Sequence, residues 1–396
     1  MELPFIQDPN TSRQLPEQVL PCSTASYDTG RIIRDDYIHP TYRTIATAAM
    51  HQWQNAEPWC RTYRRSGLVL VEDSDNNGPL KETYNLTRRE LESNGASSLV
   101  EELYCRDDIK KACGGLCDTG NWGYLTHKAG WVDAGDIMNT LLKDLKQSEN
   151  IHFECGRVKS LVKDETGDVV VGILLESGQR LVADLVVLAT GPWTSALADT
   201  RGKTVSAGEA VAYVQLQPED GEIFRKMPAF LNFEQKICLT PPSRQLFRIA
   251  LHRDDWVNTS NIDHPEVGRT DISIPPERGL GPNPSQRVSH ERQLRGALQR
   301  ISPLLASRPI VHFGYCWYDD TLTGDFIVSY HPDYQGSLFM LHGLGGHGFK
   351  FLPVLGQYAV ATVLEELDPR VKNMWKYPED VDHDRLRRDH GQGGWR

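Results

Sequence analysis

A strand, a glycine-rich turn and a helix near the end of the chain limit the possible folds more than any other segment. The apolar strand Ser337-Leu338-Phe339-Met340-Leu341 runs into the turn Gly343-Leu344-Gly345-Gly346-His347-Gly348. The apolar positions that follow are spaced 3, 4 and 4 residues apart, as in a helix with one buried face: Leu352, Leu355, Ala359 and Val363. This order of elements is typical of an α/β fold with a parallel sheet.

The turn also satisfies the pattern G-x-G-x-x-G, which occurs in dinucleotide-binding sites. A true fingerprint needs an acidic residue about twenty positions later, at the end of a second strand. Here Glu365-Glu366 ends a helix instead. We therefore expect no separate dinucleotide site from this motif, and a tight turn with close helix packing remains an alternative.

The middle of the chain predicts a helix and a β-meander. Residues 134–145 carry apolar side chains on one helical face, and short β-rich runs at 158–162, 169–175 and 180–182 are separated by turn residues. The nearly continuous apolar run 184–188 is typical of a buried parallel strand, and it ends in Ala189-Thr190-Gly191-Pro192-Trp193. A glycine there lets the backbone approach a ligand closely. Two further expectations are a long surface excursion over residues 258–289 and a helix capped by Ser289.

Composition excludes several classes of protein. The chain has 396 residues, 39% hydrophobic and 24% charged, which suits two domains or one large enzyme. No run reaches the roughly twenty apolar residues of a membrane span, and neither a signal peptide nor a C-terminal peroxisomal tripeptide is visible. A formal charge of -10 argues against nucleic acid as a partner. We expect a cytoplasmic monomer that binds no membrane.

Eight cysteines are scattered along the chain, and we expect reduced thiols because the chain is neither short nor evidently secreted. Cys113 and Cys117 could be a metal pair, but no second pair at zinc spacing lies nearby. Cys316 lies in the aromatic strand Gly314-Tyr315-Cys316-Trp317-Tyr318. By itself, a buried strand cysteine is more often an inert small hydrophobe than a reactive thiol.

The segment Asp28-Thr29-Gly30-Arg31-Ile32-Ile33-Arg34, together with 314–318 and 345–350, resembles the sarcosine oxidase family. This family includes fungal fructosyl amino acid, pipecolate and saccharopine oxidases. The resemblance covers roughly residues 20–385 and is strongest at 26–37, 184–193 and 314–351. It implies an FAD cofactor bonded covalently to Cys316. The other residues that it places near FAD are Val158, Thr190, Gly191, Trp193, Gly345, Gly346, His347, Gly348 and Phe349.

The same resemblance implies roles for the charged residues. Arg34, with Lys350 as a second positive charge, would bind a substrate carboxylate through the bidentate guanidinium fork. Arg31 would lie near the flavin, and Tyr318 would shape the pocket. Arg248 occupies the position of a lysine that activates dioxygen in the family, and this exchange is not conservative. Without the resemblance, arginines three apart are more often solvated charges on a helix face, and Arg248 a surface residue.

One part of the family pattern is not found. A strand, G-x-G-x-x-G and a helix that cradle the FAD pyrophosphate should precede Arg31, and no such motif is present there. We expect about thirty residues of this βαβ unit to be absent. A truncated gene model, a fragment and a diverged protein that binds FAD less well are the alternatives that follow.

The predicted fold is α/β, a two-domain FAD-binding oxidoreductase fold. A Rossmann-like, N-terminally truncated FAD domain would comprise residues 1–45, 125–200 and 310–396, and a substrate domain with a mixed or antiparallel sheet would comprise 46–124 and 201–309. The predicted reaction is oxidation of the C–N bond of a secondary-amine amino acid to an imine, with dioxygen reduced to hydrogen peroxide. The alternatives are a natural-product tailoring amine oxidase and a non-catalytic remnant of the family.

Overall fold

The computed structural model describes residues 25–26, 28–74, 78–276 and 284–378. The helices are α1 Pro40–Asn55, α2 Trp59–Thr62, α3 Pro79–Ser93, α4 Arg106–Ala112, α5 Ala134–Leu145, α6 Pro218–Phe224, α7 Pro284–Ile301, α8 Pro303–Ser307, α9 Leu352–Val363 and α10 Pro369–Trp375, with 3-10 turns η1 Ser97–Leu99, η2 Gly191–Ala196 and η4 Gly345–Phe351. The strands are β1 Arg31–Ile33, β2 Tyr63–Arg64, β3 Leu68–Glu72, β4 Val100–Leu103, β5 Trp122–Thr126, β6 Gly130–Val132, β7 Val158–Lys163, β8 Val170–Leu175, β9 Arg180–Val182, β10 Val186–Leu188, β11 Thr204–Gln215, β12 Ala229–Asn232, β13 Ile237–Ser243, β14 Leu246–Trp256, β15 Thr259–His264, β16 Gly268–Ser273, β17 Ile310–Thr321, β18 Ile327–Tyr330 and β19 Leu338–His342.

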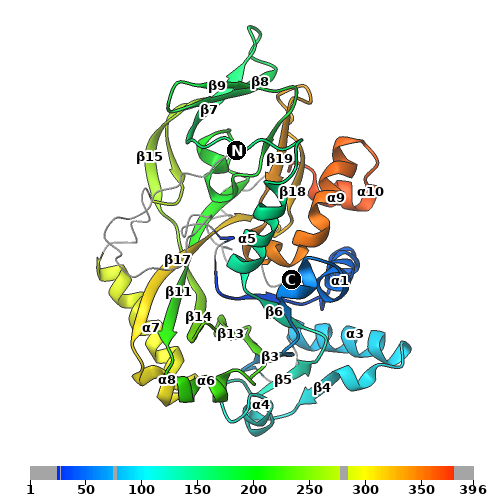
Figure 1. Cartoon of the computed structure of the whole chain (residues 1–396), viewed down its shortest axis with the longest axis vertical. Coiled ribbons are helices and arrows are strands. Elements are labelled where there is room, and N and C mark those ends of the chain that lie inside the picture. The colour runs from blue at the N-terminus through cyan, green and yellow to red at the C-terminus, as the bar shows by residue number, and fades with distance from the viewer. Residues whose placement is uncertain (1–24, 27, 75–77, 277–283, 379–396) are drawn as a thin grey trace.

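The largest sheet has eight strands in the order β17-β11-β14-β13-β12-β3-β5-β4. Only β12 and β3 run parallel among these neighbours, so the sheet is mixed. Its long strands β11, β14 and β17 extend from the centre of the molecule toward the lower end in Figure 1, where α6, α7 and α8 lie beside them. One sheet face is covered by an apolar cluster to which α7 and α8 contribute Leu294, Leu298, Ile301 and Leu305. On the opposite face, Leu68 and Leu70 of β3 and Tyr124 of β5 form a second apolar cluster with Leu80 and Tyr84 of α3.

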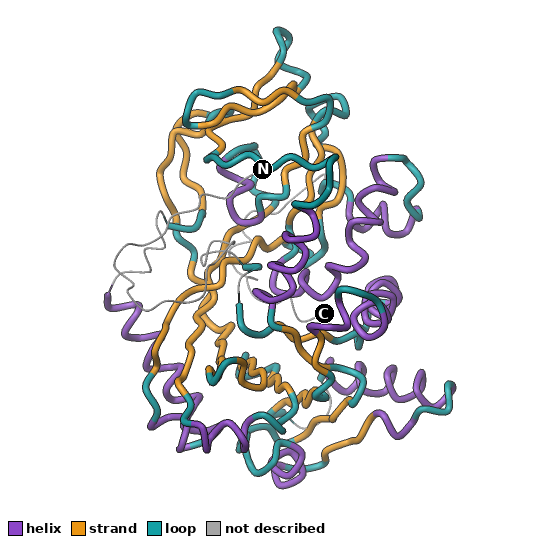
Figure 2. The backbone as a smooth tube through the Cα atoms, in the orientation of Figure 1, coloured by secondary structure: helices purple, strands orange, loops and turns teal. Residues whose placement is uncertain are grey.

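A second sheet, in the order β10-β19-β18, contains the strand of the glycine-rich turn. Strands β10 and β19 are parallel, so η2 and η4, which follow them, leave the sheet at the same edge. An aromatic core with Trp53, Phe326, Phe351 and Trp375 joins α1, α9 and α10 to this sheet, and all four side chains are almost fully buried. Figure 2 shows these helices gathered along one side of the strands.

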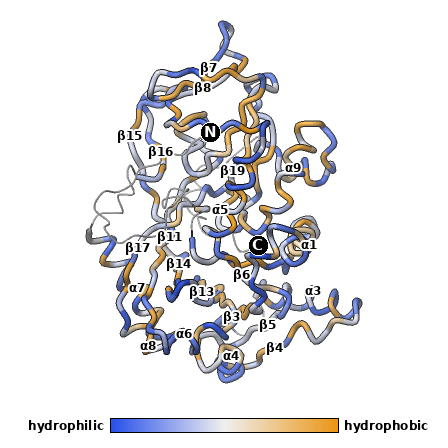
Figure 3. The backbone as a smooth tube through the Cα atoms, viewed as in Figure 1, coloured by the Kyte–Doolittle hydropathy of each residue, from blue (hydrophilic) through white to orange (hydrophobic). Residues whose placement is uncertain are grey.

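The remaining sheets are small. Strands β7, β8 and β9 form an antiparallel meander at one end of the molecule, β15 and β16 form a hairpin, and β6 lies between β1 and β2. The turn between β7 and β8 is hydrophilic, whereas β19 and α9 carry mostly hydrophobic residues (Figure 3). None of the described helices is long and apolar enough to span a membrane.

Several predictions of local structure are confirmed. Helix α5 has the predicted bounds, and Asp133 caps it by accepting a hydrogen bond from the Asp136 N–H at 3.1 Å. The meander β7–β9, the parallel strand β10 and the order β19, glycine turn, α9 also agree with the sequence. The α/β fold class is confirmed. The domain boundaries remain a prediction. Strand β17, which lies in the segment 310–396 assigned to the FAD domain, is part of the eight-stranded sheet.

Other expectations are wrong. Ser289 is no helix cap, because α7 begins at Pro284, and a proline suits the first turn of a helix. The stretch 258–289, predicted as a long surface excursion, is not one long loop, since its described residues contain the β15–β16 hairpin and the start of α7. Arg31 lies on a strand rather than on a helix face. The region expected to lack the βαβ unit precedes Arg31, and residues 1–24 lie outside the described part of the chain.

Candidate active site

One open cavity lies between the eight-stranded sheet, on the face away from α7 and α8, and the glycine-rich turn η4. The lining residues come from β1 and its neighbours, the large sheet and η4: Gly30, Arg31, Ile32, Arg34, Glu209, Leu231, Cys238, Arg248, His252, Tyr318, Asp320, Gly346, His347, Phe349 and Lys350. Segments that are far apart in the sequence therefore meet in one concave site.

Strand pairing explains why these side chains share a face. Residues that pair directly across an antiparallel sheet point to the same side. Glu209 on β11 pairs with Cys316 on β17, Tyr213 pairs with Arg248 on β14, and Thr240 on β13 also pairs with Arg248. Alternation along each strand then brings polar groups to the cavity while the intervening residues fill the apolar core.

Arg31 makes a close contact with Cys316. The guanidinium Nη2 of Arg31 lies 3.1 Å from the Cys316 Sγ and also donates to the Ala25 carbonyl at 2.5 Å. Cys316 is only 8% exposed. The buried Cys316 sulfur therefore lies in direct contact with a cation that lines the cavity.

A second ion pair holds Arg248 in the cavity wall. Its Nε lies 2.8 Å from both carboxylate oxygens of Asp28, and the Arg31 Nη1 lies 2.7 Å from the Asp28 Oδ2. The Tyr213 hydroxyl donates to the same carboxylate at 2.7 Å. Burial alone would raise the pKa of Asp28, but Arg248, Arg31 and the hydrogen bond from Tyr213 together lower it. Asp28 is therefore ionised at neutral pH and joins the two arginines.

Arg34 is fixed by a different aspartate. Its Nη1 donates to the Asp36 Oδ1 at 2.7 Å and to the Asp36 carbonyl at 3.2 Å, and the Tyr124 hydroxyl donates to the other Asp36 oxygen. The guanidinium carbon lies 5.1 Å from the centre of the Tyr37 ring and 5.8 Å from that of Phe233. Only one edge of the guanidinium is used among the described residues. Because Arg34 lines the cavity, the remaining edge of its guanidinium is suited to bind a carboxylate there.

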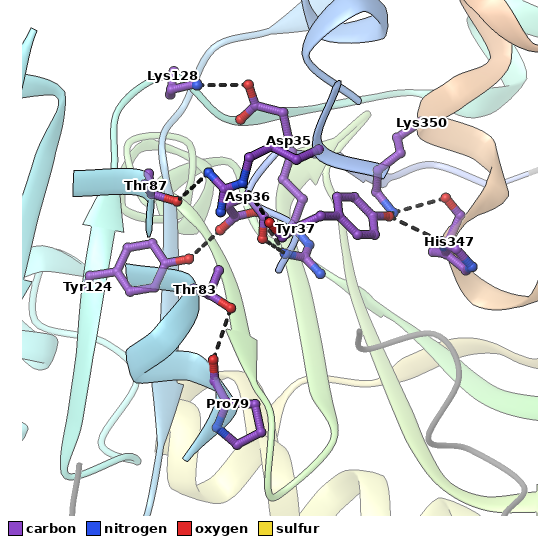
Figure 4. Close-up of polar contacts among 12 residues, drawn as sticks. Asp35, Asp36, Tyr37, Pro79, Thr83, Thr87, Tyr124, Lys128, His347 and Lys350 are labelled. Carbon is purple, nitrogen blue, oxygen red and sulfur yellow. Dashed lines mark hydrogen bonds and ion pairs between the residues drawn. The ribbon is translucent and has the colours of Figure 1, made fainter. Parts of the chain in front are cut away.

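Lys350 lies beside this arginine. Its Nζ donates to the Tyr37 hydroxyl at 2.9 Å and to the His347 carbonyl at 3.0 Å, as Figure 4 shows. Burial and, next, the positive charge of Arg34 lower the pKa of Lys350 well below its ordinary value. Burial and Lys350 also lower the pKa of His347 to about 3. A carboxylate bound between Arg34 and Lys350 would favour the protonated lysine again, because an opposite charge stabilises it.

An aromatic pair forms the wall next to the glycine-rich turn. The rings of Tyr318 and His252 are stacked with centres 5.6 Å apart. Burial and Arg248 lower the pKa of His252 to about 3, so its ring is neutral. A methyl group on Gly346 would lie 2.9 Å from the Tyr318 ring, and one on Gly345, whose φ is +51°, would lie 2.7 Å from the Asp320 Oδ1. Both positions therefore require glycine.

Most of the residues predicted from the sequence come together here. Arg31, Arg34, Arg248, Tyr318, Gly346, His347, Phe349 and Lys350 line the cavity, and Cys316 contacts it through Arg31. Gly345 and Gly348 belong to the same turn, and Thr190, Gly191 and Trp193 lie at η2, which follows β10 at the same edge of its sheet as η4. Val158 lies apart, at the start of β7 in the meander, where it packs against an apolar cluster. Their roles remain predictions.

Sequence reasoning assigned no role to several residues of the site. Asp28, Asp36 and Tyr37 bind the predicted cations, and His252 and Glu209 line the cavity. An aspartate three residues before Arg31 and another two residues after Arg34 were the available signals. Among the described residues no group of histidine, cysteine and carboxylate side chains is suited to hold a metal ion.

Comparison with known proteins gives a consistent result. The sequence model of the family described as FAD dependent oxidoreductase (DAO) matches residues 15–362. Amino acid oxidase imqH of Aspergillus flavus is 30% identical, covering 92% of this chain and 89% of the relative. L-saccharopine oxidase of Schizosaccharomyces pombe is 25% identical, covering 92% and 86%.

Solved structures agree at the level of the fold. The crystal structure of a modified fructosyl peptide oxidase from Aspergillus nidulans superposes with a TM-score of 0.81 at 20% identity. The match covers 93% of this chain and 87% of that chain. At this identity the likeness concerns the fold alone.

Proposed function

Because the chain belongs to the family of FAD dependent oxidoreductases, we propose that it oxidises the C–N bond of a secondary-amine amino acid, N-substituted or cyclic, to an imine. When bound, FAD would supply the acceptor for the two electrons of the substrate C–N bond, with dioxygen as the final acceptor that gives hydrogen peroxide. The relatives named as amino acid and saccharopine oxidases support this reaction class.

One observation supports this function above the others. Arg34 and Lys350, which together suit a carboxylate, lie in the same cavity as Arg31, the residue that contacts the Cys316 sulfur. A carboxylate held at one end and a flavin held at the other would fix the amine-bearing carbon between them. Fixing the reacting atoms in this way contributes to catalysis by lowering the entropy cost of the reaction.

The cavity also fits a flavin. Gly345 and Gly346 keep the turn η4 free of side chains where the backbone approaches Asp320 and Tyr318, so a flat ring system could lie against this backbone. The positive end of backbone dipoles at such a turn favours negative charge on a bound group. In our proposal Gly345, Gly346, His347, Gly348, Phe349, Thr190, Gly191, Trp193 and Val158 hold FAD.

We propose that Cys316 tethers the cofactor. Its sulfur would replace a hydrogen on a flavin carbon, with the thiol proton, that hydrogen and two electrons leaving to dioxygen as hydrogen peroxide. Arg31 would hold this sulfur in place, since its Nη2 lies 3.1 Å from the sulfur. Arg248 provides a positive charge in the cavity wall, which would favour electron transfer to dioxygen.

The chain's own residues then account for the rest of the reaction. Arg34 and Lys350 orient the substrate carboxylate, and Tyr318 with the neutral His252 shapes the space for the amine substituent. A substrate amine that enters uncharged needs no strong base. The monomeric state and the cytoplasmic location remain predictions.

Retention of flavin by denatured protein tests this function. We expect the wild-type band to keep flavin fluorescence after denaturation, and the Cys316→Ser band to lose it. Cys238→Ser is the matched control, because Cys238 is a thiol that lines the cavity from β13, a different strand of the same sheet. A folded wild-type chain that stays colourless with added FAD would favour the non-catalytic remnant, and fluorescence retained by Cys316→Ser would exclude the tether.

A further inference from the structure

Asp28 is a buried carboxylate at the junction of the two arginines that flank the site. Its side chain is 3% exposed, and it accepts hydrogen bonds from Arg31, Arg248, Tyr213 and its neighbouring Thr29 N–H. Asp28 itself does not line the cavity, whereas both arginines do. Any influence of Asp28 on the chemistry therefore passes through these two guanidinium groups.

The geometry defines where each guanidinium points. Arg31 uses Nη1 for Asp28 and Nη2 for the Cys316 sulfur, so the ion pair on one nitrogen sets the direction of the other. Arg248 uses Nε for both oxygens of Asp28, and its Nη1 has only a distant contact of 3.8 Å with Cys238. Among the described residues, Asp28 is therefore the main contact that fixes the Arg248 guanidinium, and it is one of the contacts that fix the Arg31 guanidinium.

Electrostatics point the same way. Two like charges that share one buried carboxylate remain close only while that carboxylate is ionised, because removing it leaves buried cations without compensation. The side chains of Arg31 and Arg248 are 12% and 2% exposed, so water does little to screen their repulsion. Without Asp28 the guanidiniums would separate and turn toward the open cavity.

We propose that Asp28 is a positioning residue that holds Arg31 against the Cys316 sulfur and Arg248 in the cavity wall, so that one carboxylate controls both the tethering of the flavin and its reoxidation by dioxygen. This inference rests on the proposed FAD-dependent function. It assigns to Asp28 a task that neither arginine performs alone, which is to fix the distance between the tethering end and the oxygen-reacting end of the site.

The matched control is Asp35→Asn. Asp35 is another buried aspartate of the same segment, 5% exposed, and it binds Lys128 Nζ at 2.7 Å (Figure 4). Neither residue lines the cavity. Both substitutions, Asp28→Asn and Asp35→Asn, remove a buried ion pair. Only the first changes the arginines of the site, so a loss of stability alone would affect both variants alike.

The experiment incubates the full-length chain and each variant with FAD, and then measures the flavin that remains on the denatured band and the rate at which the reduced, loaded protein is reoxidised by dioxygen. For Asp28→Asn we expect both quantities to fall by about tenfold, the effect of losing one charge-assisted hydrogen bond. Asp35→Asn should match the wild type in both. Asp28→Glu keeps the charge and moves it by one methylene, so we expect about a threefold or larger fall although the chain folds.

Three results separate the possible failures. Wild-type tethering and reoxidation in both Asp28 variants would overturn the positioning role and leave the proposed function intact. An equal loss in Asp35→Asn would also overturn it, because the effect would then be general destabilisation. A wild-type chain that acquires no flavin would overturn the proposed function itself, and the positioning role with it.

Discussion

Replacing Arg34 separates the structural task of this residue from its task in substrate binding. In Arg34→Gln the Asp36 carboxylate keeps the hydrogen bond from Tyr124 but loses its cation. Both partners are buried, with side chains 5% and 2% exposed. Removing one partner of such a pair costs about 3–5 kcal/mol, because an uncompensated charge remains in the interior.

The double variant Arg34→Gln/Asp36→Asn removes both charges at once. Two amides can bond to each other in place of the ion pair, so we expect most of the lost stability to return. Carboxylate binding should not return. A hydrogen bond to a charged group contributes about 1.5–3 kcal/mol, which corresponds to a rise in KM of roughly 10- to 150-fold in both variants.

The assay combines thermal melting with steady-state kinetics. KM is measured for an amino acid that the wild type oxidises and for its methyl ester, which lacks the carboxylate charge. We expect the variants to lose preference for the acid over the ester. A double variant with wild-type KM for the acid would refute Arg34 as the carboxylate anchor, and a single variant as stable as the double one would refute the buried-charge reasoning.

Two further predictions concern the glycine-rich turn and the helix after it. Gly346→Ala places a methyl group 2.9 Å from the Tyr318 ring and should lower kcat/KM by roughly 10- to 100-fold. The control is Gly356→Ala in α9, where the added methyl group meets open space; it should leave kcat/KM unchanged and raise helix stability by up to about 1 kcal/mol. Equal kcat/KM values for the two variants would contradict the close contact. The pKa of His347 is lowered from 6.5 to about 3 in the folded chain, so the folded state keeps the ring neutral. As pH falls below 6.5 the unfolded chain binds a proton at this ring and the folded chain does not, so the free energy of unfolding decreases. Between about pH 7 and pH 5 the wild type should therefore lose about 2 kcal/mol more than His347→Gln, measured by denaturant unfolding at each pH, and equal losses would show that the ring is protonated in the fold.

The elements that could be predicted from the sequence are those with a strong local signal. The apolar run before Gly343 and the periodic positions after it identify β19 and α9, and the same holds for α5 and the meander. The start of α7 was misplaced because Pro284, not Ser289, begins the helix. Helix α10 over residues 369–375 was not predicted, and its Trp375 is buried among other aromatic side chains.

The residues of the site could be predicted only in part, because contacts between distant segments leave no local signal in the sequence. A family pattern can indicate Arg31 or Arg248, but it cannot indicate their partner, since Asp28 lies 220 residues from Arg248 in the sequence. The charge of a side chain also cannot be predicted from its residue type alone, because burial shifts its pKa. Lys350 was expected to be a second positive charge, whereas burial and Arg34 lower its pKa and leave the protonated form dependent on a bound carboxylate.

The most direct test of the account is to mix the purified, flavin-containing chain with secondary-amine amino acids in the absence of oxygen and to record the visible absorption. We expect at least one N-substituted or cyclic amino acid to bleach the flavin band, and admission of oxygen to restore it with the release of hydrogen peroxide. Bound flavin that is bleached by chemical reductants but by no secondary amine would contradict the assignment of this cavity to amine oxidation.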